Sequence, residues 1–415
     1  MKKRLLYYQL LPYLKHKNAL VIVGMRQVGK TTLLKQLFEK INEPKIWFDL
    51  DNPLDQKVFE DIDYNVVYKR IVSMVAPSTV PQATKLVNSP SLMVASYTNK
   101  KRLNVFIDEI QNFPEITLII KYLIDHYNVK FVVTGSSSYY LKNLFPESLA
   151  GRKFLFELNP LHFQEYLYFN DVISEKDAQS TQNIKDMLSI DIVHYSKYSS
   201  YYDEYLQFGG FPEVVITKNK ELKKEVLKNI FKSFFEKDIR LLSDYKDVKD
   251  LRDLLILLVP RVGSMIDITK ISSELAVDRV KLYSYLEFLQ SIFIIKLLPK
   301  FSKSIDRTVA GGKKVYFSDN GIINAISTVN ESQLFENSVV NQLAKYGELS
   351  FYNRRNTAEI DVIVNKKVAI EIKITATDQY INDLNKVAES IGIIEKFIIS
   401  KNFVPLNRVL YASQL

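Results

Sequence analysis

The chain has 415 residues, which is enough for about two to four domains of ordinary size. It carries 56 basic and 47 acidic side chains, a formal charge of +9, and this surplus weakly favours an anionic partner. It has no cysteine and only four, widely spaced histidines, which excludes disulfides, thiol nucleophiles and Cys-ligated zinc. Carboxylates, lysines, hydroxyls and bound phosphate are left to do any chemistry.

No segment has the character of a membrane span or a secretion signal. The longest unbroken apolar run, 254–260, is far shorter than the roughly 18–20 residues that cross a bilayer. The first twenty residues predict an amphipathic helix before a strand, because charged residues interrupt the leucines and no cleavage pattern follows. We expect a cytoplasmic protein with no membrane partner, which the absence of cysteine fits.

From about residue 18 to 170, short β-rich runs alternate with helical patterns. Near-continuous apolar strands separated by helices are typical of a parallel sheet covered on both faces, so we predict an α/β fold. The expected strands are 19–24, 45–50, 103–108, 130–135 and 153–158, with helices between them, among them 64–75 and one around 138–145. The proline-rich stretch 76–91 predicts a loop insertion.

The rest of the chain changes character twice. Residues 171–200 are polar and aperiodic and predict a connection, after which helical patterns continue to about 291. A β-like run follows, then a helix near 332–346, a hairpin near 358–375, another helix and a strand. We predict a P-loop core at 1–170, a linker and helical lid at 171–245, a winged helix at 246–315 and a small α/β nuclease-like domain at 316–415.

The segment GMRQVGKT (24–31) lies between a predicted strand and a predicted helix, the context of a phosphate-binding loop. In such a loop backbone N–H groups surround a polyphosphate, Lys30 reaches its outer phosphates, and the Thr31 hydroxyl joins the Mg²⁺ shell. We therefore expect ATP and Mg²⁺ as ligands. The residues expected to contact nucleotide here are Gly24, Arg26, Gln27, Val28, Gly29, Lys30, Thr31 and Thr32.

Two acids follow the predicted strand in LNVFIDE (103–109). Asp108 would stand at the carboxyl end of that strand, where α/β sheets place their ligands, and could hold magnesium. Glu109 could orient and deprotonate the attacking water, which favours hydrolysis over nucleotide storage. The alternative is a strand end with two solvated acids.

Two further polar positions are candidates for the same site. In FVVTGSSS (131–138), Thr134 and Ser136 end a predicted strand, and Ser136 could sense the outer phosphate through water. A plain Gly-Ser turn remains an alternative. Arg152, in LAGR (149–152), could neutralise charge in the transition state, and an ordinary surface arginine is the other reading of it.

The combination of GMRQVGKTT, FIDEIQ, VTGSSS, LAGR and LQFGGFPE resembles the archaeal and bacterial AAA+-type ATPases that carry a restriction-endonuclease-like C-terminal domain. This resemblance covers most of the chain. It implies an ATPase in which Lys30 and Thr31 are phosphate and magnesium ligands, Asp108 is the magnesium acid and Glu109 activates water.

Two short helices, a turn and a β-like run between 265 and 298 are typical of a winged helix-turn-helix. Thr269 and Asp278 are the expected N-caps. The segment 296–314 holds six basic residues and one acid, which suits a wing that contacts phosphate. The expected DNA-binding residues are Arg279, Lys281, Tyr283, Ser284, Lys300, Lys303 and Arg307. A packing module with a solvated rim is the alternative.

A hairpin predicted in NTAEIDVIVNKKVAIEIKIT (356–375) brings carboxylates together. Pairing the apolar faces across a three-residue loop sets Val364 opposite Val368, and so Asp361 opposite Glu371 and Glu359 opposite Lys373. Opposed like charges destabilise a hairpin unless something compensates, and a divalent cation can do so.

This pattern resembles the metal-dependent nuclease core of restriction endonucleases and Holliday-junction resolvases. The resemblance implies that Glu336, Asp361 and Glu371 hold Mg²⁺ while Lys373 stabilises the attacking hydroxide or the phosphate. An exposed salt bridge, or an inactive domain that keeps the fold for binding, is the alternative.

Three hypotheses remain at this point. The first is an ATPase that acts on DNA through the winged-helix and nuclease-like regions, with a second copy of the chain or another protein as further partners. The second is a nucleotide switch that binds a protein or DNA and cuts nothing. The third, a DNA-binding protein with a vestigial nucleotide site, is disfavoured by Lys30, Asp108 and Glu109.

Overall fold

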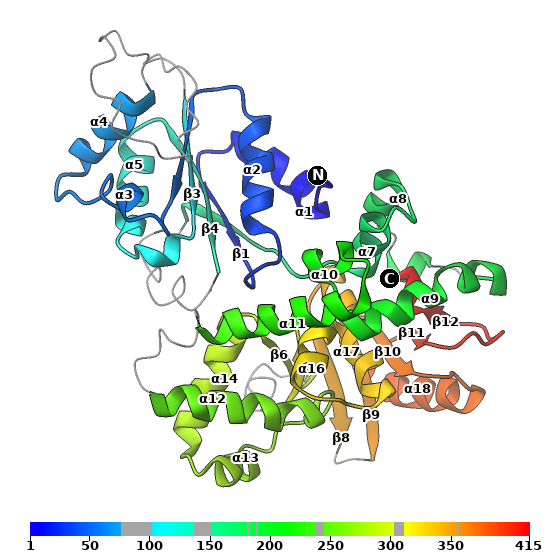
Figure 1. The fold of residues 1–415 in the computed structure, drawn as a ribbon. Helices are drawn as coiled ribbons and strands as arrows, with labels where there is room; N and C mark the ends of the chain where they lie inside the picture. Colours follow the sequence, from blue (N-terminus) through cyan, green and yellow to red (C-terminus); the bar gives the residue numbers. More distant parts are fainter. Residues whose placement is uncertain are drawn as a thin grey trace. The chain divides into compact units, whose positions relative to one another are not determined.

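The chain forms two compact units, Met1–Asn159 and Pro160–Leu415, which are described separately (Figure 1). The computed structural model describes residues 1–75, 102–136, 149, 151–180, 183–187, 190–236, 245–302, 311–354 and 357–415. The insertion expected at 76–91 and the helix expected around 138–145 lie outside these residues. Within the described ranges, every helix is too short or too polar to cross a membrane.

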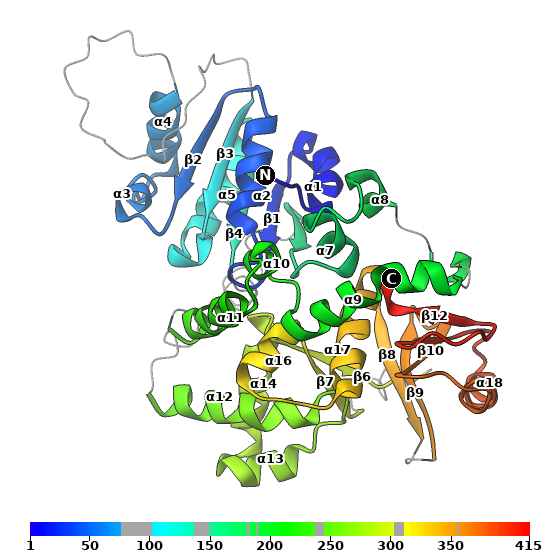
Figure 2. The ribbon, with the colours of Figure 1, turned by 45° about the vertical axis from the view of Figure 1, so that its right-hand side comes forward.

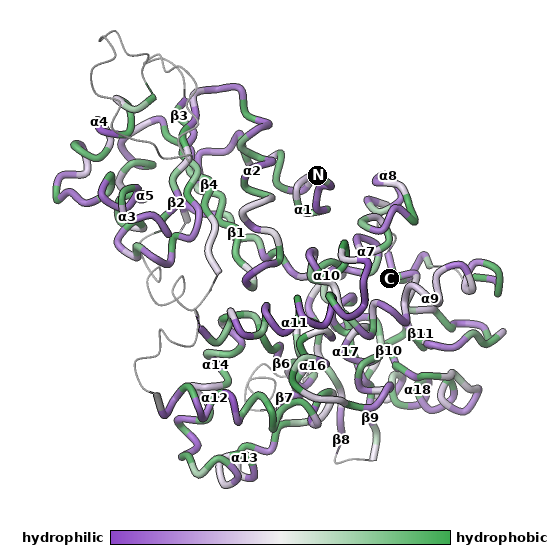
Figure 3. The backbone as a smooth tube through the Cα atoms, viewed as in Figure 1, coloured by the Kyte–Doolittle hydropathy of each residue, from purple (hydrophilic) through white to green (hydrophobic). Residues whose placement is uncertain are grey.

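The first unit is built on a five-stranded sheet in the order β2-β3-β4-β1-β5. Every neighbouring pair is parallel. The strands are β1 (Ala19–Val23), β2 (Lys45–Asp49), β3 (Leu103–Asp108), β4 (Val129–Gly135) and β5 (Lys153–Glu157). Strands β1, β3 and β4 are buried along their whole length, and β1 and β4 are largely green in Figure 3. The predicted parallel α/β fold is confirmed.

Helices cover both faces of this sheet. Figure 1 shows α1 (Leu5–Leu10) and α2 (Lys30–Lys40) on one side and α4 (Tyr64–Val75) and α5 (Ile116–His126) on the other. The short helices of this unit are η1 (Leu11–Lys15), α3 (Pro53–Gln56) and η2 (Ile110–Asn112). Because all strands are parallel and β4 lies between β1 and β3, the carboxyl ends of these three strands share one edge.

The second unit begins with helices. They are α7 (Phe163–Phe169), α8 (Glu175–Gln179), η3 (Ile184–Asp186), α9 (Ile192–Phe208), α10 (Pro212–Ile216) and α11 (Lys220–Phe234). The expectation of an aperiodic connection up to residue 200 is wrong for its last part, because α9 starts at Ile192. Its inward contacts come largely from tyrosines, which hide the apolar pattern: the Tyr202 hydroxyl is 2.9 Å from Ser338, and the Tyr205 hydroxyl donates to the Leu161 carbonyl at 2.9 Å.

Three helices and a strand pair follow; the helices and the first strand come in the predicted order, and the second strand was not predicted. They are α12 (Tyr245–Leu258), η5 (Val259–Arg261), α13 (Ile268–Leu275), α14 (Arg279–Ser291) and the antiparallel strands β6 (Ile295–Pro299) and β7 (Lys313–Phe317). Asp278 caps α14 as predicted, accepting from the Lys281 N–H at 2.8 Å. The predicted cap Thr269 is wrong, because the Asp267 carboxylate reaches the Lys270 N–H and α13 starts before Thr269.

The chain ends in a mixed sheet in the order β12-β11-β10-β9-β8. Its strands are β8 (Leu349–Arg354), β9 (Ala358–Val364), β10 (Val368–Lys373), β11 (Glu395–Ser400) and β12 (Val409–Tyr411). Figure 2 shows the sheet between α17 (Glu331–Leu343) and α18 (Asp378–Ile391). The remaining elements are α16 (Asn320–Ile326), η6 (Ala344–Tyr346) and η7 (Ala412–Gln414). Sequence reasoning missed β8 and β12.

Candidate functional sites

The predicted phosphate loop connects the end of β1 to the start of α2. Gly29 is the N-cap of α2 and has φ 97°, in the left-handed region that favours glycine. Gly24 has φ 150°, and a Cβ added there would lie 2.2 Å from the Leu158 carbonyl oxygen. The glycine therefore allows a close approach between the loop and the chain leaving β5. Arg4 holds the same loop from outside, donating to the Val28 carbonyl at 2.8 Å.

Lys30 points back under this loop. Its Nζ donates to the carbonyl oxygens of Gly24 at 3.0 Å and Met25 at 2.8 Å, and the side chain is buried. The lysine ammonium is thus held where the loop closes, at the N-terminus of an eleven-residue helix. Free backbone N–H groups at such a terminus attract anions.

Asp108 lies at the carboxyl end of β3 and is 3% exposed. Burial raises the pKa of this carboxyl group, while hydrogen bonds from the Thr134 and Thr31 hydroxyls oppose that rise. The contact with Thr31 joins the end of β3 to the first turn of α2. The contact with Thr134 follows from the position of β4 between the two strands. A carboxylate beside two hydroxyls is a set of hard oxygen ligands that fits Mg²⁺.

Glu109 is held in a left-handed backbone conformation, with φ 55°. Its N–H donates to Thr134 Oγ1 at 3.2 Å, and the Gln111 amide donates to its carboxylate. Gln111 also accepts from the Ser136 N–H at 3.2 Å. Gln111 therefore links the acid after β3 to the end of β4. Gln111 belongs to the FIDEIQ motif, but the sequence alone did not indicate a role for it.

The Ser136 hydroxyl is the unused polar group of this edge. Its oxygen is buried and has no hydrogen-bond partner among the described residues. Buried polar atoms are normally paired, so an unpaired hydroxyl on a residue bound to Gln111 fits a bound phosphate or water. The other residues of the predicted loop differ in exposure. Gln27 is exposed with φ 63°, Val28 is buried, and Arg26 and Thr32 are half-buried.

The structure does not bring Arg152 to this edge. The residue immediately precedes β5, and its carbonyl accepts from the Ala19 N–H at the amino end of β1, whereas the phosphate loop follows the carboxyl end. Its side chain binds Asp125 of α5 at 2.6 Å. The prediction that Arg152 serves the site of its own chain is therefore wrong, because Arg152 and the phosphate loop lie at opposite ends of β1.

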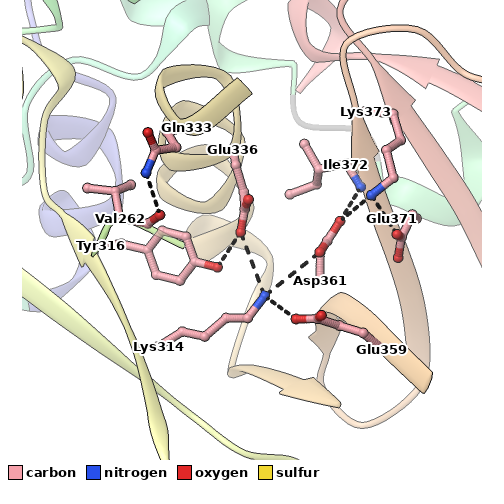
Figure 4. Close-up of polar contacts among 10 residues, drawn as sticks. All are labelled: Val262, Lys314, Tyr316, Gln333, Glu336, Glu359, Asp361, Glu371, Ile372 and Lys373. Atoms are coloured by element: carbon pink, nitrogen blue, oxygen red, sulfur yellow. Dashed lines mark hydrogen bonds and ion pairs between the residues drawn. The ribbon is translucent and has the colours of Figure 1, made fainter. Parts of the chain in front are cut away.

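A second cluster of charges lies in the C-terminal unit (Figure 4). Glu336 comes from α17, Glu359 and Asp361 from β9, and Glu371 from β10. The predicted register is confirmed, with Val364 opposite Val368 and Val362 opposite Ile370. The Ile372 N–H donates to the Asp361 carboxylate at 2.9 Å. Asp361 of β9 therefore lies next to the part of β10 that carries Glu371, as expected.

Two lysines lie among these carboxylates. Lys373 is 2.6 Å from Glu371 and 3.4 Å from Asp361. Lys314 of β7 is 2.7 Å from Glu359 and 3.8 Å from both Glu336 and Asp361. The register places Glu359 opposite Lys373, but the ammonium that binds Glu359 is that of Lys314, which reaches it from another strand pair. Lys314 was missed here because the sequence placed it on a solvent-exposed wing.

Burial and mutual repulsion alter the acids of this cluster. The pKa values of Glu336 and Glu371 are each raised to about 7, first by burial and then by the charge of Asp361. Burial lowers the pKa of Lys314, but the carboxylates of Asp361, Glu336 and Glu359 outweigh it and leave that pKa raised. The Tyr316 hydroxyl adds a hydrogen bond to Glu336 at 2.7 Å.

The fit of this cluster to a metal ion is mixed. Four carboxylates face two ammonium groups, which leaves an excess of negative charge, and one Glu371 oxygen is buried without a partner. A divalent cation would supply both the charge and the ligand contact. As the described residues stand, however, no group of three or more acids or histidines is arranged to hold a metal. The lysines stand between the acids.

The predicted DNA-reading helix, α14, presents only part of the expected set. Arg279, Tyr283 and Ser284 are exposed, whereas Lys281 is half-buried and bound to Asp247 of α12 at 2.7 Å. On the predicted wing, Lys313 is exposed and Lys300 is half-buried. Counting Lys314 toward the wing charge is wrong, because it is 4% exposed and bound to carboxylates. Lys303 and Arg307 lie outside the described residues.

Comparison with known proteins bears on the first unit most directly. Residues 16–167 match the family model described as AAA domain. The parallel five-stranded sheet within these residues has the fold of a P-loop NTPase. Two further models, each described as a domain of unknown function, match residues 199–333 (DUF8612) and 331–409 (DUF4143). The phosphate loop, Asp108, Glu109 and Ser136 lie within the first match, and the charge cluster falls mainly within the third.

Two curated relatives align with most of the chain. An uncharacterised protein of Methanocaldococcus jannaschii is 27% identical over 354 residues, covering 83% of this chain and 71% of the relative. An uncharacterised protein of Haemophilus influenzae is 26% identical over 359 residues, covering 83% and 79%. The alignments cover most of both chains, and the uncharacterised relatives assign no activity.

Solved structures give a weaker likeness. A Walker-type ATPase of Pyrococcus abyssi is 15% identical with a TM-score of 0.45, covering 77% of this chain and 94% of that one. The ORC1 protein of Aeropyrum pernix, solved in complex with DNA, is 14% identical with a TM-score of 0.29, covering 77% and 90%. Similarity of this degree says nothing about function.

Proposed function

We propose that the AAA-type domain binds ATP with Mg²⁺ and hydrolyses it, and that the C-terminal unit uses this cycle to act on DNA. The observation that carries the first part is the arrangement of Asp108, with the hydroxyls of Thr31 and Thr134 on its carboxylate and the Glu109–Gln111 pair beside it. Together these groups supply a metal ligand set and a base at one sheet edge.

The chain's own residues suggest how hydrolysis proceeds. The loop N–H groups and Lys30 bind the phosphates, Lys30 exchanging its carbonyl partners at Gly24 and Met25 for phosphate oxygens. Thr31 and Asp108 would hold Mg²⁺, which neutralises charge on the transferred phosphoryl group. Glu109, oriented by Gln111, accepts the proton of the attacking water, and the Ser136 hydroxyl hydrogen bonds to the outer phosphate or that water.

Phosphate release from ATP tests this proposal. Lys30→Ala is expected to abolish nucleotide binding and turnover. Glu109→Gln is expected to keep ATP binding but lower the turnover rate by roughly 100-fold, because it removes the base and leaves the loop intact. Glu115→Gln, an exposed glutamate at the start of α5, is the matched control. Undiminished turnover in Lys30→Ala would refute the assigned site.

Magnesium-dependent cleavage of DNA is a second candidate function, favoured by the excess carboxylates and the unpartnered Glu371 oxygen. Glu336, Asp361 and Glu371 would hold Mg²⁺, which polarises a phosphodiester and lowers the pKa of water. Lys373 lies within 3.4 Å of Asp361 and can donate to charge developing on the phosphate. The lysines already pairing with these acids favour the rival, a nucleotide switch that binds a partner without cutting.

Linear, branched and single-stranded DNA, each with Mg²⁺ or Mn²⁺, separate cleavage from a switch. The nuclease is supported if the intact chain cuts DNA and Asp361→Ala abolishes the cutting. The control Asp383→Ala, at an exposed position of α18, should leave the cutting unchanged. An inert wild type with ATP-dependent DNA affinity would support the switch. Loss of DNA affinity in an Arg279→Ala, Tyr283→Ala double variant would assign binding to the exposed face of α14.

A further inference from the structure

The C-terminal unit contains a cavity of about 440 Å³ apart from the carboxylate cluster. Its walls come from α7, α8, α9, η6 and the last residues of the chain, and they include Lys197, Tyr198, Lys345, Tyr346 and Ser413. Cavities that bind small molecules commonly measure roughly 300–1,000 Å³ and combine apolar walls with a few convergent polar groups.

Two lysines face this cavity in the same way. Lys345 Nζ lies 5.0 Å from the centre of the Tyr346 ring, and Lys197 Nζ lies 4.9 Å from the centre of the Tyr198 ring. Among the described residues, neither ammonium has a carboxylate at ion-pair distance. The aromatic rings hold the two ammonium groups in place without neutralising them.

The Ser413 hydroxyl is a second, independent observation. Ser413 is 9% exposed, and its oxygen is buried without a hydrogen-bond partner among the described residues. Its backbone carbonyl is used, accepting from Gln164 at 3.3 Å. The Ser413 hydroxyl has no hydrogen-bond acceptor among the described residues, and the two ammonium groups line the same cavity. An anionic oxygen could accept from the hydroxyl and from the ammonium groups.

The carboxylates around the cavity offset the two ammonium groups only in part. Asp177 lines it and accepts from the Ser174 N–H at 3.2 Å and the Ser174 hydroxyl at 2.7 Å, and its charge acts on Lys197 from beyond ion-pair distance. His194 also lines it and pairs with Asp191 at 3.4 Å. Burial lowers the pKa of Lys345 to about 8, opposed by the charge of Glu165 on α7. Among the described residues this ammonium thus has no carboxylate at ion-pair distance, and its side chain is exposed beside the cavity.

We propose that this cavity binds a small phosphorylated molecule of about mononucleotide size, with the phosphate between Lys345, Lys197 and the Ser413 hydroxyl. The site is separate from the phosphate loop and from the carboxylate cluster, because it shares no residue with either. A ligand bound there would allow a small molecule, in addition to ATP at the phosphate loop, to regulate the unit that is proposed to act on DNA.

Isothermal titration calorimetry of the full-length Lys30→Ala chain tests this, because that substitution removes phosphate binding at the loop. AMP is expected to bind with a stoichiometry near one, inorganic phosphate to compete with it, and adenosine not to bind. Lys345→Met and Lys197→Met are each expected to weaken AMP about 10-fold or more, and Ser413→Ala several-fold. Lys386→Met, an exposed lysine of α18, should change nothing.

The outcomes are decisive in both directions. Absence of AMP binding, equal binding of adenosine, or unchanged affinity in both lysine variants would overturn the proposal. Lys345→Met should fold, because Lys345 is exposed at the surface of η6, and its melting temperature checks this. If it does not fold, Lys197→Met carries the test, since Lys197 is exposed. Affinity should also fall as the pH rises through about 8 in the parent chain, as Lys345 loses its charge.

Discussion

The backbone N–H of Gly210 donates to the buried carboxylate of Asp319 at 2.7 Å. The same carboxylate accepts from the Gly321 N–H at 2.7 Å, so Asp319 joins the end of α9 to the start of α16. The LQFGGFPE segment contributed to the family resemblance, and this contact gives it a structural role. Its two glycines let the backbone close on an acid from a distant part of the unit.

Alanine at either glycine should destabilise the second unit strongly. A Cβ at Gly209 would lie 1.9 Å from the Asp319 carboxylate, and one at Gly210 would lie 2.2 Å from the Leu161 carbonyl. We expect losses above about 4 kcal/mol, or failure to fold, measured by chemical denaturation. Gly151→Ala is the control: its φ is 72° but nothing lies within 4 Å, so roughly 1–2 kcal/mol is expected. Equal losses at all three positions would contradict this explanation.

Asp319 should make stability depend on pH. Burial raises its pKa to about 7 from 3.8, despite the backbone N–H groups that donate to it. The native state then binds a proton more tightly than the unfolded chain, so this contribution is complete below pH about 4 and is lost as the pH rises through about 7. The expected change is on the order of 1–4 kcal/mol.

Denaturation at several pH values measures this slope. Asp319→Asn should be less stable overall, because an amide cannot accept all the N–H bonds, but its stability should vary less between pH about 4 and about 7. A slope identical to that of the parent chain would assign the effect to other groups.

Local patterns made part of this chain predictable. The phosphate loop, Asp108 at a strand end and the hairpin register each depend on neighbouring residues with a fixed spacing, so strand and helix periodicity located them. Gly210 and Asp319 are 109 positions apart, and no local pattern relates them. The prediction for Lys314 failed for the same reason. The net charge of the segment 296–314 suggested a wing, but the Lys314 side chain points inward to Glu359 of β9, which is distant in the sequence.

Gln111 is predicted to act by positioning Glu109. Gln111→Ala frees the Glu109 carboxylate and removes the acceptor for the Ser136 N–H, while the phosphate loop is untouched. Turnover should fall roughly 10-fold with little change in the ATP concentration at half-maximal rate, and Gln111→Glu should not restore it, because glutamate cannot donate to Glu109. Asn112→Ala, next in the chain and exposed, is the control. A change in ATP affinity alone would contradict a positioning role.

Lys314 is predicted to act as an internal counterion of the carboxylate cluster. Lys314→Met leaves the half-buried Glu336 and the buried Asp361 without that ammonium, and the exposed Glu359 loses its partner, so the second unit should lose roughly 3 kcal/mol or more. Divalent cations should recover part of this loss, because a metal can occupy the position that the ammonium leaves. The melting temperature of the variant should therefore rise with Mg²⁺ or Mn²⁺ by more than that of the parent chain.

Lys313→Met is the matched control for that substitution, since Lys313 is the neighbouring residue on β7 and is exposed. It should change neither the stability nor its dependence on Mn²⁺. If Lys314→Met is destabilised but gains nothing from Mn²⁺, the cluster is an ion-pair network that does not accept metal, which would favour the non-cutting switch over the nuclease. If the variant gains stability and then cuts DNA with Mn²⁺, the lysine restrains a competent metal site, since its ammonium competes for the same oxygens.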